Sequence, residues 1–96
     1  MGKMYISGKI TGLDYQEAFN SFELAEKEFL IKGWEVINPM KLKHQHDESW
    51  QNYMREDLKA LLDCGCVYML NNWEDSVGAR IEHKLAMDLE ILIIYQ

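Results

Sequence analysis

The stretch CVYMLNNWEDSVGARIEHKLAMDLEILIIY, residues 66–95, decides the fold. It begins with an apolar run at 66–70, continues with a helical pattern from about Ser76, and closes with a second apolar run at 91–95. Continuous apolar runs of this length are typical of strands that are buried on both faces. Two such strands joined by a helix predict a parallel β-α-β unit with a right-handed crossover.

The segments that precede this unit continue the same alternation. Further strands are predicted at 3–7 and 34–37, and further helices at about 14–31 and 49–63. Asp14 and Ser49 are suitable N-cap residues, and Gly33 and Pro39 are typical of a helix end and a loop. Four strands that alternate with three helices predict an α/β fold with a parallel sheet.

Length, composition and charge limit the possible functions. The 96 residues, 1–96, are expected to form a single domain, and this small chain is expected to act as a homodimer or higher homo-oligomer. A net charge of −6 argues against binding to polymeric nucleic acid. No apolar run reaches the length of a membrane span and no signal sequence is evident, so we expect a cytoplasmic protein without membrane contact.

Glu82 is the strongest candidate for chemistry. Leu85, Ala86 and Leu89 follow it by three, four and seven positions, which places all four side chains on one face of a helix. That face is expected to pack on the sheet, at the edge where open α/β sheets bind ligands. Burial would then perturb the pKa of the carboxylate. The alternative is a glutamate that turns to solvent or caps a neighbouring loop.

The loops that follow parallel strands lie at one edge of the sheet, so their side chains are expected to converge. Gly8 and Gly12 allow a ligand to approach the backbone, although glycines after strands are commonly ordinary turns. Ser76 and Gly78 open a helix whose free N–H groups favour an anion. The residues expected at this edge are Ser7, Gly8, Lys9, Gly12, Asn38, Trp73, Ser76, Gly78 and Glu82.

Several other side chains have both a functional and a structural interpretation. Trp73 follows a strand and could stack on a base, whereas Tyr5 and Tyr68 lie within strands and are more typical of a core. The basic candidates for a phosphate site are Lys9, Lys41, Lys43, Arg55 and Arg80, of which Lys9 is favoured by its place in the glycine loop. His44, His46 and Asp47 do not form a standard metal-ligand set, so we expect no metal.

Five groups of residues resemble one family of small domains. They are Tyr5-Ile6-Ser7-Gly8, Ile10-Thr11-Gly12, Asn38-Pro39, Met54-Arg55 with Asp57-Leu58, and Trp73 with Ser76, Gly78-Ala79 and Glu82. The family is the nucleoside 2-deoxyribosyltransferase-like family (DUF4406), and the resemblance runs over residues 3–95. The pattern Ser-x-Gly-Ala-x-x-Glu after an apolar strand is its most specific part.

The resemblance implies a flavodoxin-like three-layer sandwich with a parallel sheet of four to five strands. It also implies a relationship to enzymes, including deoxynucleoside 5′-monophosphate N-glycosidases, that cleave the N-glycosidic bond of a 2-deoxynucleotide or nucleoside without a cofactor. Glu82 would be the nucleophile that attacks the anomeric carbon. Ser76 would bind a 5′-phosphate, and Tyr5, Ser7 and Gly8 would approach the sugar.

The sequence departs from the family pattern at two positions. Gly65 stands where the family commonly has an aspartate, which resembles the acid/base group of the enzymes, and Asp63 lies two positions before it. Lys9 stands where the family loop usually has proline. Two alternatives to an N-glycosidase or deoxyribosyltransferase therefore remain: a nucleotide-binding module with impaired catalysis, and a structural or interaction protein. The second predicted helix, with Trp50, Tyr53 and Met54, is the expected dimer interface.

Overall fold

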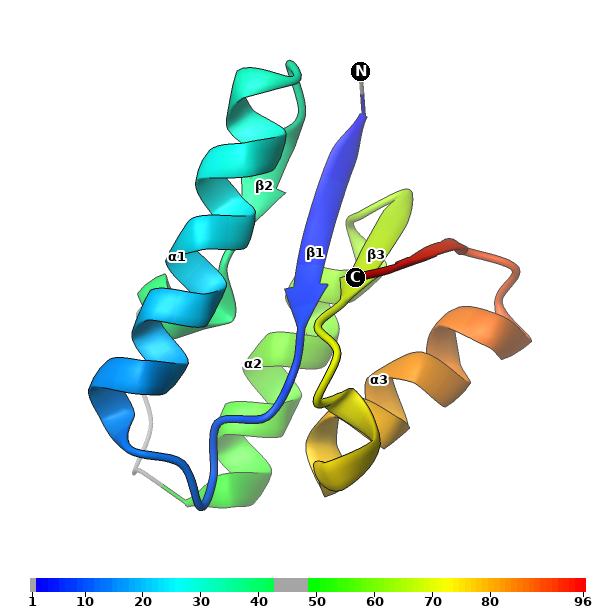
Figure 1. The fold of residues 1–96 in the computed structure, drawn as a ribbon. Helices are drawn as coiled ribbons and strands as arrows, with labels where there is room; N and C mark the ends of the chain where they lie inside the picture. The colour runs from blue at the N-terminus through cyan, green and yellow to red at the C-terminus, as the bar shows by residue number, and fades with distance from the viewer. Residues whose placement is uncertain (1, 43–48) are drawn as a thin grey trace.

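The computed structural model describes residues 2–42 and 49–96 as a parallel sheet covered by helices on both faces (Figure 1). The strands are β1 (Lys3–Ser7), β2 (Glu35–Ile37), β3 (Cys66–Met69) and β4 (Leu92–Tyr95), in the spatial order β2-β1-β3-β4. The helices are α1 (Tyr15–Ile31), α2 (Trp50–Leu62) and α3 (Val77–Asp88), with short 3₁₀ helices η1 (Pro39–Lys41) and η2 (Trp73–Asp75). The predicted α/β, flavodoxin-like sandwich is confirmed, with four strands.

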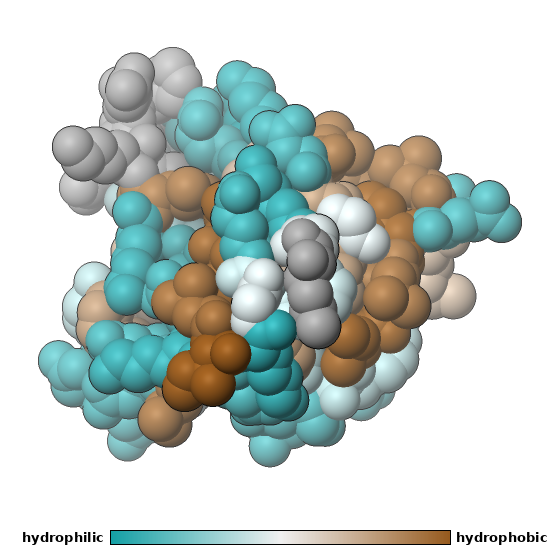
Figure 2. Space-filling view, turned by 90° about the horizontal axis from the view of Figure 1, so that it is seen from above, coloured by the Kyte–Doolittle hydropathy of each residue, from teal (hydrophilic) through white to brown (hydrophobic). Residues whose placement is uncertain are grey.

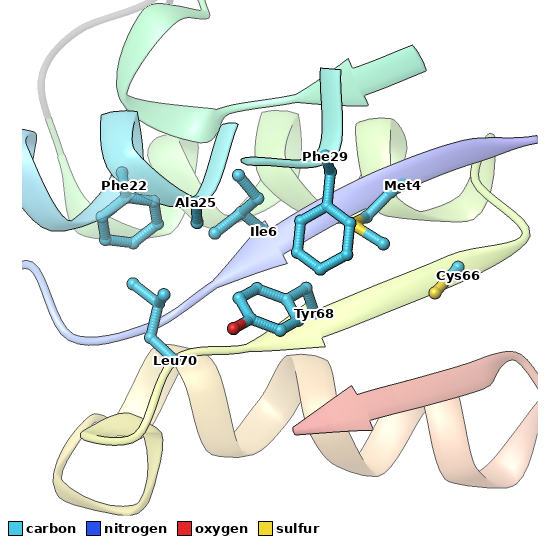
Figure 3. Close-up of a cluster of buried hydrophobic side chains, with 8 residues drawn as sticks. All are labelled: Met4, Ile6, Phe22, Ala25, Phe29, Cys66, Tyr68 and Leu70. Atoms are coloured by element: carbon cyan, nitrogen blue, oxygen red, sulfur yellow. The ribbon is translucent and has the colours of Figure 1, made fainter. Parts of the chain in front are cut away.

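The alternation of side chains along β1 and β3 builds a core on each face of the sheet. Met4 and Ile6 pack under α1 with residues of β3, and the rings of Phe29 and Tyr68 meet edge to face at 4.6 Å between centroids (Figure 3). The intervening side chains, such as Tyr5, face α2 and α3. One helix therefore covers one face and two helices cover the other.

The helices begin where the sequence predicts. The Asp14 carboxylate accepts a hydrogen bond from the Glu17 N–H at 3.2 Å, and the Ser49 and Ser76 hydroxyls cap α2 and α3 in the same way. Gly33 follows α1 with a φ of 93°, a conformation that glycine adopts at little cost. Local sequence signals therefore fix the start of each helix.

The prediction that the last strand is buried on both faces is wrong. β4 forms an edge of the sheet, and Leu92 and Tyr95 are 58% and 55% exposed. Leu89, predicted on the buried face of α3, caps the end of that helix and is 51% exposed. Figure 2, seen from the amino end of β1, shows apolar side chains gathered on the side that carries α3 and β4. A helix that would cover β4 on the α1 face is absent from residues 2–42 and 49–96.

The order of the strands creates a crevice at one edge of the sheet. From β1 the chain crosses through α1 to β2 on one side, and it later returns through α2 to β3 on the other side (Figure 1). The connections after β1 and β3 consequently diverge toward opposite faces at the carboxyl ends of these neighbouring strands. Open α/β sheets bind their ligands at such a switch point. Among the described residues, no helix is long and apolar enough to span a membrane.

Candidate functional site

The Glu82 carboxylate lies at the switch point and is held by two hydroxyl groups of β1. The Tyr5 hydroxyl donates a hydrogen bond to Oε2 at 2.7 Å, and the Ser7 hydroxyl donates one to Oε1 at 2.6 Å. Tyr5 and Ser7 lie two positions apart in a strand, so their side chains point to the same face. The two bonds hold both carboxylate oxygens in a defined orientation beneath α3.

The environment of Glu82 makes its proton affinity unusual. The side chain is 5% exposed, and this burial is the main cause that raises the pKa of Glu82 to about 7. The hydrogen bonds from Ser7 and Tyr5 lower that pKa, while the negative charge of Asp57 raises it. A carboxyl group with a pKa near neutrality exchanges readily between its acidic and its nucleophilic form.

Tyr5 stays a hydrogen-bond donor at physiological pH. Burial, followed by the negative charges of Glu82 and Asp57, raises the pKa of Tyr5 well above its ordinary value. The side chain is fully buried, so its hydroxyl is directed to Glu82 by the surrounding core. Tyr5 thus belongs both to the core, as its place in a strand predicts, and to the site.

A cavity of about 920 Å³ opens above Glu82. Residues of the loop after β1, of α1, of η1, of α2 and of the start of α3 form its walls. Three of the aromatic side chains that line it, Tyr15, Trp50 and Tyr53, are not fully buried and come from α1 and α2. The other lining residues are Tyr5, Gly8, Lys9, Ile10, Thr11, Phe22, Pro39, Met40, Leu42, Met54, Asp57, Asp75, Ser76, Val77, Gly78, Ala79 and Glu82. A volume of this size is ample for a nucleoside.

Asp57 is a site residue that the sequence analysis names only as part of the family resemblance, without a role in the site. It lines the cavity, and its charge acts on both Glu82 and Tyr5. Its signal was the helical spacing in α2, because Asp57 follows the buried Met54 by three positions and therefore points to the same side of the helix. The site accordingly contains two carboxyl groups within electrostatic reach of one another.

The loop after β1 is shaped by packing against the residues that follow β3. A Cβ atom on Gly8 would lie 2.7 Å from Cδ1 of Leu70, so only glycine fits there. The Lys9 N–H donates to the Asn72 side chain at 3.0 Å, and Gly12 adopts a φ of 89°. Gly8 and Lys9 line the cavity, whereas Gly12 supplies the turn that leads into α1.

The start of α3 forms the opposite wall. Ser76 and Gly78 line the cavity as predicted, and the Ser76 hydroxyl oxygen accepts a hydrogen bond from the Ala79 N–H at 3.1 Å. A Cβ atom on Gly78 would lie 3.0 Å from Sδ of Met54, so this glycine also allows α2 to approach closely. Gly78 therefore brings the Asp57 helix and the Glu82 helix together.

Four of the predicted binding residues do not line the cavity: Ser7, Gly12, Asn38 and Trp73. Asn38 is buried, and its amide caps η1 through the Met40 N–H at 3.0 Å and donates to Glu26 at 3.3 Å. Trp73 stacks on His83 at 4.1 Å between ring centroids and packs beside α3. The contacts of Asn38 hold the chain after β2, and the Trp73 ring contacts the His83 ring.

Most predicted phosphate partners also lie elsewhere. Lys41 pairs with Glu26 at 2.7 Å, Arg80 donates to the Glu74 carbonyl at 2.7 Å, and Arg55 donates to the Asn52 side chain. Lys9 is the one cation in the described lining of the cavity. The remaining candidates, Lys43, His44, His46 and Asp47, fall outside the described residues.

The position of Gly65 corrects one interpretation of the sequence. Gly65 donates to the Lys3 carbonyl at 3.0 Å, at the amino end of β3, whereas Ser7 and Glu82 meet at the carboxyl end of β1. Strands rise about 3.3 Å per residue, so the length of β1 separates Gly65 from the Ser7 level by roughly 13 Å. An aspartate at position 65 could not reach the site, and neither Gly65 nor Asp63 lines the cavity.

The α2 side chains that were expected at a dimer interface have contacts or surroundings within the single chain. Met54 is buried in the fold, and Trp50 and Tyr53 line the cavity. These side chains therefore have a role within a single chain, and a homo-oligomer remains a prediction.

Comparison with protein-family models identifies a family for nearly the whole chain. A family model described as a domain of unknown function (DUF4406) matches residues 2–95. No curated protein and no solved structure shows a significant match.

Proposed function

Because this chain belongs to the DUF4406 family, a family of domains of unknown function, we propose its activity from its own site. The proposed activity is cleavage of the N-glycosidic bond of a nucleoside or 2-deoxynucleotide, with Glu82 as nucleophile. The single observation that supports it most is the buried Glu82 carboxylate, held by Tyr5 and Ser7 at the base of a cavity of nucleoside size.

The proposed reaction begins with attack on the anomeric carbon of the sugar. A bond forms between this carbon and an oxygen of the Glu82 carboxylate, and the bond to the base nitrogen breaks with its electron pair leaving on the base. The transition state has oxocarbenium character, which a nearby negative charge stabilises. The hydroxyls of Tyr5 and Ser7 keep the carboxylate oriented, which lowers the entropic cost of attack.

The second carboxyl group suits the proton transfers of the same reaction. Asp57 lines the cavity beside Glu82, so we assign to it the donation of a proton to the departing base. It would then take a proton from the water, or from the acceptor base, that releases the sugar from Glu82. A positioned acid or base of this kind contributes about a hundred- to ten-thousand-fold in rate.

Base release from a panel of nucleosides and 2-deoxynucleoside 5′-monophosphates, followed by chromatography, tests the proposal. The Glu82→Gln variant is expected to lose base release by at least about a thousandfold, because an amide is a poor nucleophile. Glu74→Gln is a matched control, since Glu74 lies on η2 outside the cavity lining. Base release by Glu82→Gln at the wild-type rate would refute the assignment.

A nucleotide-binding module without turnover is the second candidate. The observation that favours it is the hydrogen bonding of both Glu82 oxygens, which reduces the nucleophilicity of a carboxylate. Binding of a nucleoside to the wild-type protein with no base release over days would support this candidate. Because Gly65 lies at the opposite end of β3, it does not explain such a loss.

A further inference from the structure

The charges around the cavity have a consequence for the leaving group that the site accepts. The described lining contains three carboxyl groups, on Asp57, Asp75 and Glu82, and one cationic side chain, that of Lys9. The chain as a whole carries a net charge of −6 and does not offset this local excess. A positively charged ligand is therefore favoured over an anionic one inside this cavity.

Asp75 lies at the start of α3, where the free N–H groups would otherwise attract an anion. It lies directly before Ser76, the N-cap of α3, and lines the cavity there. A carboxylate beside a helix start offsets the partial positive charge of the free N–H groups. This wall of the cavity is thus less suited to a phosphate dianion than the helix start alone indicates.

The aromatic side chains supply the complementary surface for a planar cation. Tyr15 and Trp50 line the cavity and are 65% and 43% exposed, so their rings are accessible to a ligand. Tyr53 lies one turn from Trp50 on α2 and lines the same wall. Aromatic faces attract cations, and tryptophan attracts them most strongly. Stacking and charge therefore favour the same kind of heterocycle.

We propose that this cavity selects nucleosides whose base is a positively charged heteroaromatic ring, such as a pyridinium or an N-alkylated purinium. The proposal rests on the proposed N-glycosidase function and narrows its substrate class. In the reaction, the bond from the anomeric carbon to the ring nitrogen breaks, and its electron pair neutralises the base. No proton has to be donated to this leaving group. The positive charge moves toward the sugar, where Glu82 forms the new bond.

The test compares two ligands of the same shape and different charge. Nicotinamide 2′-deoxyriboside carries a pyridinium cation, and its 1,4-dihydro form is neutral. Binding of both to Glu82→Gln, which prevents turnover and keeps the carboxyl groups of Asp57 and Asp75, is measured by calorimetry. The cation is expected to bind about tenfold more tightly at low salt, and the ratio is expected to fall as salt is added.

A second variant tests whether the preference for the cation arises from the charges of the cavity. Asp75→Asn in the Glu82→Gln background is expected to reduce the preference about threefold, since one partly screened charge is removed. Asp88→Asn is the matched control, because Asp88 ends α3 away from the cavity and pairs with Lys84 at 2.7 Å. Equal binding of the two ligands, or an unchanged preference in Asp75→Asn, overturns the proposal.

Turnover separates the failure of this inference from the failure of the proposed function. Wild-type protein that releases base from neutral nucleosides, together with equal binding of the two ligands, leaves the glycosidase function standing and removes the charge preference. If the cation binds preferentially but wild-type protein releases no nicotinamide, the charge preference stands and the glycosidase function fails. Release of nicotinamide by wild-type protein, together with tighter binding of the cation than of the neutral ligand, supports both.

Discussion

The hydroxyl of Tyr5 lies 2.7 Å from the Oε2 atom of Glu82, across 77 positions of sequence. The bond joins the first strand of the chain to its last helix, and the Ser7 hydroxyl adds a second bond to the same carboxylate. Both donors stabilise the charged form of a group that burial drives toward its neutral form. The ionisation of Glu82 is consequently the property most accessible to experiment.

The rate of base release should depend on the protonation of Glu82. Its pKa is raised to about 7, and only the ionised carboxylate is a nucleophile, so kcat/KM should rise as the pH increases through 7. Tyr5→Phe removes one donor to the charged form and should move this rise to higher pH by about one unit. A pH–rate profile of both proteins measures the shift, and identical profiles would contradict it.

The same pKa predicts how stability changes with pH. A carboxyl group whose pKa rises on folding, here from 4.5 to about 7, favours the folded state most below pH 4.5, and this contribution is lost as the pH rises through 7. This rise in the pKa of Glu82 corresponds to about 3 kcal/mol. Urea unfolding at pH 4.5 and pH 8 should show this loss in the wild-type protein. Glu82→Gln lacks the titrating group, so an equal loss in that variant would refute the origin of the effect.

Two variants test which end of the sheet carries the proton donor: one removes an aspartate and the other introduces one. Asp57→Asn should slow release of a neutral base by about a hundredfold or more, because the proposed proton donor is lost. Gly65→Asp should leave the rate unchanged, since position 65 lies at the amino end of β3. Steady-state kinetics with 2′-deoxyinosine compares them. A gain of activity in Gly65→Asp would show that the acid acts from that end after all.

The structure requires glycine at position 8 but not at position 65. Gly8→Ala places a Cβ atom 2.7 Å from Cδ1 of the buried Leu70 and should cost about 1–3 kcal/mol of unfolding free energy. Gly65→Ala meets no atom within 4 Å and should change that energy by less than about 0.5 kcal/mol. Denaturation midpoints measure both, and equal effects would mean that the loop after β1 can move away from Leu70.

The features of the fold that the sequence predicts correctly are those set by local patterns. The caps at Asp14, Ser49 and Ser76 and the alternation of strands and helices need only neighbouring residues, and they agree with the structure. The apolar-face position of Glu82 also follows from helical spacing. The exposure of β4 could not be predicted in this way, because an apolar run has the same appearance whether or not a helix covers it.

Side-chain placement at the carboxyl ends of the strands was harder to predict for a physical reason. All loops at that edge converge in principle, but the direction of each side chain depends on tertiary packing. Asn38 turns toward η1 and Glu26, and Trp73 turns toward His83. Helical spacing places Asp57 on the Met54 side of α2, but its position in the site also depends on the close approach of α2 to α3 at Gly78, a contact between distant segments.

The five residues of β1 also determine where the chain can change in length. Met4 and Ile6 face the core under α1, while Tyr5 and Ser7 face Glu82. Inserting or deleting one residue in this strand would turn the hydroxyls into the apolar core and an aliphatic side chain toward the carboxylate. Insertions can therefore be accommodated in the turn around Gly12, where the chain is exposed, but not in the strand that precedes it.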